Sequence, residues 1–381
     1  MSVDKKTKKK RRRLLGFVFS IASIIILTYI SISLITGRGL NFSWVMGIFT
    51  PRAPVEIADE FFFDVGRDRV FANLDGFIAS VGTLGIQVLD YGGNETLRDT
   101  FRMARPAVRA LNSRAIAFDI GGTAVRVFDS GNIISAVEAS GPIISASINR
   151  NGWFTVSTQE GGGLRGVATV YNSQGTAVYR ANMGSGYVLT SALSPDNRSF
   201  AVLNLADAGS RIPQFHGLNQ RDPDNTFVLP GTVIIDIHYL STGYLLAIST
   251  DSLIALDYGG AARTLFDFFD ERLGGFIFYD DMIILHLLEH GVGHSGKLLR
   301  LNGAGQIQAE LSLSREIISM SFSGGHMAVL WSDGITVFDE NFEKIPLTSD
   351  NITMAGVNRI LALSEGNALA TGEHVAVGIR N

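Results

Sequence analysis

The segment Ile86–Gly93, IQVLDYGG, shows a pattern from which the fold can be inferred: a short apolar run, then an aspartate, then a glycine turn. Runs of this kind, rich in Val, Ile and Phe, are typical of β-strands joined in hairpins. An Asp or Asn just before the turn can accept hydrogen bonds from the backbone two residues on, so we expect it to have a structural role. Related segments recur along the chain as VFDSG (127–131), VYNSQG (170–175), ALDYGG (255–260), RLNGAG (300–305) and VFDENF (337–342).

The recurring polar residue gives the period of the repeat. Its positions are 39, 43, 85, 45 and 37 residues apart, and the interval of 85 holds two units if a degenerate copy lies near His216. The mean is then 41.5 residues per unit, with room for four short strands. A repeat of about 40–45 residues with four strands is the β-propeller signature. The polar positions are Asp90, Asp129, Asn172, Asp257, Asn302 and Asp339.

The sequence therefore predicts an all-β propeller, with eight four-stranded blades favoured and seven as the alternative. One further repeat step from Asp339 reaches the C-terminal segment HVAVGIRN (374–381), which supplies the eighth unit. Propellers of this kind close by lending an N-terminal strand to the last blade. We expect EIADEFFFD (56–64) to serve as that strand.

The N-terminal region predicts a membrane anchor. Leu14 to Ile35 is 22 residues long without a charged side chain, and a helix of that length spans about 33 Å, enough for the hydrocarbon core of a bilayer. The preceding KKTKKKRRR (5–13) is strongly basic, so the N-terminus should stay in the cytoplasm. A cleavable signal peptide is the alternative, but the apolar run is long and no A-x-A cleavage pattern follows it. The predicted organisation is a basic cytoplasmic tail (1–13), one transmembrane helix (14–35), a stalk (36–55) and an extracytoplasmic propeller (56–381).

Composition excludes several classes of function. The chain has 381 residues and no cysteine, so disulfides, cysteine metal sites and thiol nucleophiles are ruled out. From Leu14 onward it carries 24 basic and 35 acidic residues, which argues against non-specific nucleic-acid binding. A long exported domain without cysteine favours a bacterial envelope over an endoplasmic-reticulum lumen.

The basic tail, anchor, stalk and repeats together resemble known propeller proteins. In general shape the chain resembles WD40-like and quinoprotein-like propellers, although the G-H…W-D signature and a repeated tryptophan-docking motif are both missing. It is most similar to an uncharacterised family of membrane-anchored propeller proteins of Gram-positive bacteria, known only as a domain of unknown function. That resemblance implies the fold and the anchoring, and it supplies no catalytic residue.

Two short motifs resemble catalytic sites. FDIGGTAV (118–125) resembles the first phosphate loop of sugar kinases of the actin-like superfamily, but it falls where the second unit needs a hairpin. HLLEH (286–290) matches the inverted zincin pattern, whose two histidines need a helix to share one face with the metal. Its flanks predict a strand that enters a glycine loop, so we expect neither a peptidase nor a metal site there. His290 and His294 could meet across that turn and hold a metal adventitiously. The simpler interpretation is that they are exposed polar residues of a hairpin without a function.

One segment interrupts the repeat and is the sequence's best candidate for a binding site. Ala206–Gly231 reads as a long polar loop, and long loops on rigid scaffolds are where binding residues tend to lie. A solvated insertion with no role is the alternative. The candidate binding residues are Asp207, Arg211, His216, Arg221, Asp222 and Asp224.

These features favour a protein-interaction or scaffolding module of the cell envelope, with the propeller displayed outside the membrane and bound to an envelope protein. We expect no cofactor, no metal and no nucleic-acid partner. The alternative is a cell-envelope hydrolase acting on glycan or peptide, with its site at the propeller channel. Polar residues from several blades, converging there with shifted pKa values, would favour the enzyme. A sensor of a small ligand is a third hypothesis, weakened by a 13-residue tail that is too short for a signalling domain.

Overall fold

The computed structural model describes residues 57–160, 163–206, 209–216, 225–230, 232–257, 261–291, 293–348 and 355–381. The predicted tail, transmembrane helix and stalk lie outside these residues. Within the described ranges, no helix has the length and apolar character needed to span a bilayer. Residues 56–381 form one compact unit, and everything described below belongs to it.

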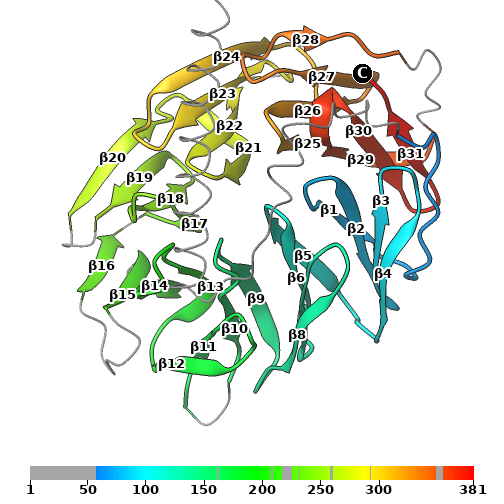
Figure 1. The fold of residues 1–381 in the computed structure, drawn as a ribbon. Helices are drawn as coiled ribbons and strands as arrows, with labels where there is room; N and C mark the ends of the chain where they lie inside the picture. The colour runs from blue at the N-terminus through cyan, green and yellow to red at the C-terminus, as the bar shows by residue number, and fades with distance from the viewer. Residues whose placement is uncertain are drawn as a thin grey trace, which may run out of the picture. The chain divides into compact units, whose positions relative to one another are not determined.

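The unit is an all-β propeller with seven four-stranded blades and a further three-stranded sheet (Figure 1). Strand order in every sheet follows chain order, and all pairs are antiparallel. Blade 1 comprises β1 (Val70–Asn73), β2 (Phe77–Gly82), β3 (Gly85–Asp90) and β4 (Glu95–Thr100), and blade 2 comprises β5 (Pro106–Leu111), β6 (Arg114–Asp119), β7 (Ala124–Phe128) and β8 (Ile133–Glu138). Blade 3 comprises β9 (Ile143–Ile148), β10 (Phe154–Thr158), β11 (Gly166–Tyr171) and β12 (Ala177–Met183). Blade 4 comprises β13 (Tyr187–Leu193), β14 (Ser199–Ala206), β15 (Gly209–His216) and β16 (Asn225–Pro230).

Blades 5 to 7 and the three-stranded sheet complete the ring. We call the three-stranded sheet the closing sheet, because it lies between blade 7 and blade 1. A single 3-10 turn, η1 (Ser364–Gly366), precedes its second strand. Blade 5 comprises β17 (Ile234–Tyr239), β18 (Leu245–Ser249), β19 (Ser252–Leu256) and β20 (Ala262–Asp267), and blade 6 comprises β21 (Glu271–Tyr279), β22 (Met282–Glu289), β23 (Gly296–Asn302) and β24 (Ile307–Leu313). Blade 7 comprises β25 (Ile317–Ser323), β26 (His326–Trp331), β27 (Gly334–Phe338) and β28 (Lys344–Ile345). The closing sheet comprises β29 (Val357–Ala362), β30 (Ala368–Gly372) and β31 (Ala376–Ile379).

The apolar core is divided among the blade interfaces. Each of eight buried clusters joins side chains of two neighbouring sheets; for example, Ile248 of β18 and Leu285 of β22 belong to one cluster between blades 5 and 6. A blade therefore buries both faces, and strands such as β18 (LLAIS) are buried at every residue. This explains why the sequence shows fully apolar runs as well as alternating ones.

The recurring Asp or Asn has the structural role that the sequence predicts. It lies at the turn between the third and fourth strands of a blade, and its side-chain oxygen accepts backbone N–H groups of that turn. Asp339 Oδ1, for example, accepts from Asn341 N and Glu343 N, both at 2.8 Å. The same bonds are made by Asp90, Asp129, Asn172, Asp257 and Asn302.

The ring closes through both ends of the unit. Glu60 pairs with Val377 of β31 in an antiparallel bridge, flanked by hydrogen bonds from Phe61 N to Ala376 O and from Gly378 N to Asp59 O. The predicted N-terminal contribution is confirmed, although it is a one-residue bridge and not a full strand. The all-β propeller is also confirmed. Seven blades have four strands, as the alternative count allowed, and the predicted eighth unit is the closing sheet.

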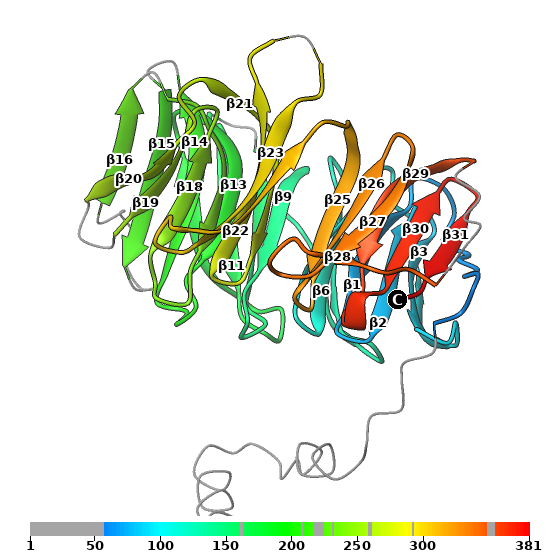
Figure 2. The same cartoon turned by 90° about the horizontal axis from the view of Figure 1, so that it is seen from above.

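The strands run between two faces of the ring (Figure 2). We call the face that carries the turns between first and second strands the entry face, because Ile57 lies there. Ala58 N donates to Tyr91 O in an entry-face turn of blade 1, and Arg380 Nε donates to Ile57 O. The opposite face carries the turns between second and third strands and the links between blades, and we call it the far face.

The structure corrects the prediction for residues 206–231. The segment is not an insertion, because β15 and β16 within it are the two outer strands of blade 4. Pro213 explains the difficulty: proline has no N–H for a ladder and argues against a strand in sequence. The pairing of β14 with β15 is interrupted between the pairs Ala201–Gln214 and Asn204–Arg211, and the register is the same on both sides of the gap.

Candidate functional site

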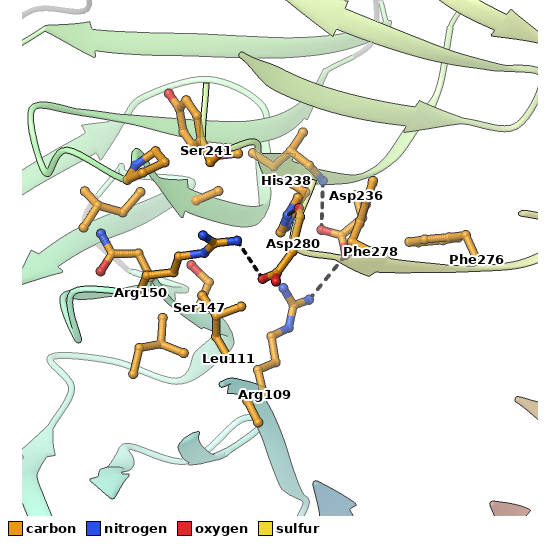
Figure 3. A pocket seen from close by; sticks show the side chains of 18 residues that line it. Arg109, Leu111, Ser147, Arg150, Asp236, His238, Ser241, Phe276, Phe278 and Asp280 are labelled. Carbon is orange, nitrogen blue, oxygen red and sulfur yellow. Dashed lines mark hydrogen bonds and ion pairs between the residues drawn. The ribbon is translucent and has the colours of Figure 1, made fainter. Parts of the chain in front are cut away.

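The mouth of the central channel on the entry face holds a cavity of about 360 Å³ (Figure 3). It is lined by the ends of the first strands of blades 2 to 6 and by the turns that follow them. Each of these blades packs against its neighbours through buried clusters, and ligand pockets are usually preformed on such scaffolds. We call this cavity the channel pocket.

Two ion pairs cross the channel pocket. Arg109 of β5 lies with Nη2 3.6 Å from Asp236 Oδ2 of β17, joining blades 2 and 5. Arg150, which follows β9, lies with Nη2 2.8 Å from Asp280 Oδ1 in the β21–β22 turn, joining blades 3 and 6. Figure 3 shows the arginines reaching toward the aspartates from the opposite side of the pocket. The pocket thus has a cationic wall and an anionic wall.

An aromatic wall lies beside the aspartates. The ring of His238 stacks on that of Phe278 with centroids 5.0 Å apart and planes at 10°, and Phe276 meets Phe278 edge-on at 5.4 Å. His238 Nε2 is 2.9 Å from the Asp280 carbonyl oxygen, which can only accept, so His238 carries its proton on Nε2. Burial lowers the pKa of His238, although the Asp280 carbonyl and nearby carboxylates act in the opposite direction.

The two aspartates are held in place by backbone geometry. Asp236 lies at a register irregularity of β17, and its Oδ1 accepts from Ile237 N at 2.9 Å. Asp280 occupies the left-handed region with φ of 49°, which aspartate tolerates better than most side chains. Its neighbour Asp281 accepts from Ser241 N at 2.6 Å and from Ser241 Oγ. Burial alone would raise the pKa of Asp281, but these hydrogen bonds outweigh it and the pKa is lowered.

The arginines keep their hydrogen-bonding capacity. The 3.6 Å separation of Arg109 from Asp236 exceeds hydrogen-bond length. Arg150 Nη2 and Asp280 Oδ1 are close but poorly aligned, so among the described residues Asp280 Oδ1 has an ionic partner and no hydrogen-bond partner. The charged groups of the pocket therefore neutralise each other, but they do not use up each other's hydrogen-bonding capacity.

The two motifs that resemble catalytic sites are ordinary hairpins. FDIGGTAV joins β6 to β7, and its glycine amides are used within the fold: Gly121 N donates to Ile143 O and Gly122 N to Asp119 O. HLLEH lies in β22 and the following turn, as predicted, so His286 is buried in blade 6 while Glu289 is exposed. Within the described parts of the chain, no three His, Asp or Glu side chains gather as a metal site would require.

The predicted binding residues lie either on the third strand of blade 4 or outside the described residues. Arg211 and His216 lie on β15, whose backbone pairs with β14 and β16. Asp207, Arg221, Asp222 and Asp224 lie outside the described residues. That these six side chains bind a partner stays a prediction.

No local motif marks the pocket residues, yet the spacing of the repeat contains a signal for them. Arg109, Arg150, Asp236 and Asp280 are successively 41, 86 and 44 residues apart, close to one, two and one repeat lengths. Residues at one phase of a propeller repeat lie at the same height around the axis. Charged residues in phase with the repeat therefore point to a ring of side chains at one channel mouth.

A second surface feature lies on the far face. Among the described residues, seven of the eleven large apolar side chains with high exposure belong to far-face turns, links or strand ends. Blades 4, 5 and 6, which are consecutive, contribute Tyr187, Val233 and Ile235, and the link residue Phe269, and we call these four the apolar arc. Phe269 is 84% exposed and Tyr187 61%, and the guanidinium of Arg165 lies 5.4 Å from the Tyr187 ring centroid.

Comparison with known proteins identifies the fold and a family. The model of a family of unknown function, DUF5711, matches residues 62–345. The structure is similar to the C-terminal WD40 domain of Sif2, with TM-score 0.56 and 12% identity over 85% of this chain and 99% of that one. It is also similar to BamB from Moraxella catarrhalis, with TM-score 0.51 and 16% identity over 86% and 98%. No curated protein matches the sequence.

Proposed function

Because the chain belongs to DUF5711, a family of unknown function, its role rests on its own surfaces, and we propose that it is a membrane-tethered interaction module of the cell envelope. In this proposal residues 14–35 span the membrane, the basic tail stays in the cytoplasm and the propeller lies outside. The propeller docks an envelope protein through the apolar arc. Propellers host both binders and enzymes, so the fold alone does not decide between them.

The position of the apolar arc carries this proposal. Isolated exposed apolar side chains are ordinary, but a group of them on one face marks an interaction surface. Tyr187, Val233, Ile235 and Phe269 come from three consecutive blades, and aromatic residues are enriched at such interfaces. They lie on the face opposite Ile57, which is the first described residue of the ring.

Site-specific photo-crosslinking in cells tests the docking surface. A photoreactive phenylalanine analogue would replace Tyr187 or Phe269 in the full-length chain, and Tyr244, which is 48% exposed on the entry face, would serve as the matched control. We expect one and the same envelope protein to be captured from both far-face positions and not from Tyr244. Ile235→Asp, which places a charge in the apolar arc, should abolish that product.

Three results would contradict this assignment. Capture of a second copy of this chain would make the far face a homodimer interface, and capture of lipid would make it a membrane surface. A product from Tyr244 that persists in Ile235→Asp would move the interface to the entry face.

The enzyme hypothesis keeps one favourable observation. Polar side chains from blades 2, 3, 5 and 6 do converge at the channel, and the pKa of His238 is lowered. His238, however, uses Nε2 on a backbone carbonyl, and Asp236 and Asp280 each face an arginine. Turnover of envelope glycan or peptide fragments by the full-length protein, abolished by Asp280→Asn, would establish the hydrolase and displace the interaction module.

A further inference from the structure

The channel pocket is a site with opposite charges on opposite walls, and it lies on the other face from the apolar arc. Arg109 and Arg150 come from blades 2 and 3, whereas Asp236 and Asp280 come from blades 5 and 6. All four side chains are partly exposed, with relative exposures between 20% and 42%, so a ligand can reach them. The cavity of about 360 Å³ falls in the range of pockets for small molecules.

The geometry of the two ion pairs across the pocket allows a ligand to replace them. Arg109 and Asp236 are in ionic contact beyond hydrogen-bond length. Despite its proximity to Arg150, Asp280 Oδ1 has no hydrogen bond to any residue that the structure describes. A guanidinium fork binds a carboxylate in a bidentate manner, and a carboxylate accepts readily from an ammonium group. Each group in the pocket can therefore make a better bond to a ligand than it makes now.

We propose that the channel pocket binds a small zwitterionic amino compound, a free amino acid or a short peptide with an apolar side chain. Its carboxylate binds Arg109 and Arg150, and its ammonium binds Asp236 and Asp280. Such a ligand replaces both internal ion pairs and leaves no charge in the pocket without a counter-charge. A purely anionic ligand would leave the aspartates without partners, and a purely cationic one would do so to the arginines, which is costly in a partly buried site.

The third wall sets the preference for an apolar side chain. Phe276 and Phe278 line the pocket, and Leu111 and Leu193 contribute aliphatic surface. His238 adds a flat, uncharged face, because burial lowers its pKa. An aromatic or branched aliphatic side chain of the ligand can pack there.

Isothermal titration calorimetry of the full-length protein in detergent tests the proposal with matched probes. Phenylalanine carries both charges, 3-phenylpropanoate lacks the ammonium group and phenethylamine lacks the carboxylate. We expect phenylalanine to bind about tenfold more tightly than either analogue, which is the effect of one unpaired charge in a partly buried site. Glycyl-phenylalanine, whose charges lie farther apart, distinguishes the two sources: tighter binding than phenylalanine identifies a peptide, and weaker binding a free amino acid.

Variants assign each charge to its wall. Asp280→Asn should remove the advantage of phenylalanine over 3-phenylpropanoate, because the ammonium group loses its partner. Arg109→Gln should remove the advantage over phenethylamine. Arg198→Gln is the control, since Arg198 is an entry-face arginine outside the pocket lining. If Asp280→Asn proves unstable, Asp236→Asn repeats the test on the neighbouring blade.

Two outcomes would overturn the zwitterion site. One is binding of either singly charged analogue within twofold of phenylalanine in the unmodified protein. The other is no detectable binding of phenylalanine or of the dipeptide at millimolar concentration. Neither outcome affects the far face, because docking of an envelope protein there is tested by the photo-crosslinking experiment.

Discussion

Arg150 Nη2 lies 2.8 Å from Asp280 Oδ1 although the two residues belong to blades 3 and 6 and are separated by 130 positions in the chain. The contact exists because each residue follows the first strand of its blade, at the same channel mouth. Together with Arg109 and Asp236 it connects blades that share no strand pairing.

The ion pair between Arg150 and Asp280 should contribute little to stability. Both side chains are more than a third exposed, and exposed pairs of this kind contribute about 0.2–1 kcal/mol. A double-mutant cycle with Arg150→Met and Asp280→Asn, followed by urea denaturation, measures the coupling; Asn is chosen because it tolerates the positive φ of 49°. The coupling should shrink in high salt. A value above about 2 kcal/mol would show a rigid structural bridge and not an exchangeable pair.

The turn aspartates should matter more than the charges beside them. Asp339→Ala removes an oxygen that accepts two backbone N–H groups at 2.8 Å, so we expect a loss of about 1 kcal/mol in the free energy of unfolding. Asp339→Asn keeps an accepting oxygen and should be nearly neutral. Asn341→Ala in the same turn serves as the control, and equal losses in the Ala variants would contradict the assigned role.

The two phenylalanines of the link before blade 6 should behave oppositely. Phe268 is 2% exposed, and Phe268→Ala should cost about 3–5 kcal/mol by leaving a cavity. Phe269 is exposed and has φ of 40°, a conformation that bulky residues avoid, so Phe269→Asn should stabilise the fold by up to about 1 kcal/mol. Urea midpoints measure both changes. The proposed docking adds that Phe269→Asn weakens capture of the partner, whereas a loss of stability in this variant would show that Phe269 supports the fold.

Acid should destabilise the propeller through two histidines. Burial lowers the pKa of His286, and burial is also the main cause of the lowered pKa of His238. A histidine with a lowered pKa binds fewer protons in the folded than in the unfolded state, so stability falls as pH drops below about 6.5. His286→Leu should flatten that part of the pH profile, measured by urea denaturation at intervals between pH 7 and pH 5. An unchanged slope in His286→Leu would show that this histidine is not responsible.

The absence of cysteine makes the proposed topology easy to test. Ser2→Cys and Asp270→Cys would each introduce a single thiol, the first in the predicted cytoplasmic tail and the second on the far face. A membrane-impermeant maleimide should label Asp270→Cys in intact cells and Ser2→Cys only after lysis. The reverse labelling pattern would overturn the N-in orientation, and labelling of neither position before lysis would place the propeller inside the cell.

Local turn chemistry makes the fold predictable, except at the two outer strands of blade 4. The Asp or Asn at each turn between third and fourth strands, such as Asp129 and Asn302, marks a conformation that the backbone needs, so its spacing reports the repeat. Residues 206–231, which form the outer half of blade 4, read as a polar loop in sequence because polar residues predominate there, and Pro213 in the middle of β15 adds to that effect. There the neighbouring strands, and not local preference, decide the conformation.

The channel pocket could not be derived from local pattern, because each of its charged residues is an ordinary surface residue within its own blade. Asp236 and Asp280 acquire significance only when the ring brings them opposite Arg109 and Arg150. The ring brings together residues that are far apart in the chain. The sequence indicates this only because these residues occupy equivalent positions in successive repeats.

The bridge between Glu60 and Val377 has a mechanical consequence. Residues 57–61 are the first described residues after the segment expected to lead to the anchor, and they hold β31 through two backbone hydrogen bonds and the ion pair between Arg380 and Asp59. Tension on that segment would load the C-terminal strand before any other blade. Residues 57–61 and β31 run antiparallel side by side, so a pull along their axis must break these bonds together, in shear. The contact that closes the ring is therefore also the contact that bears the load.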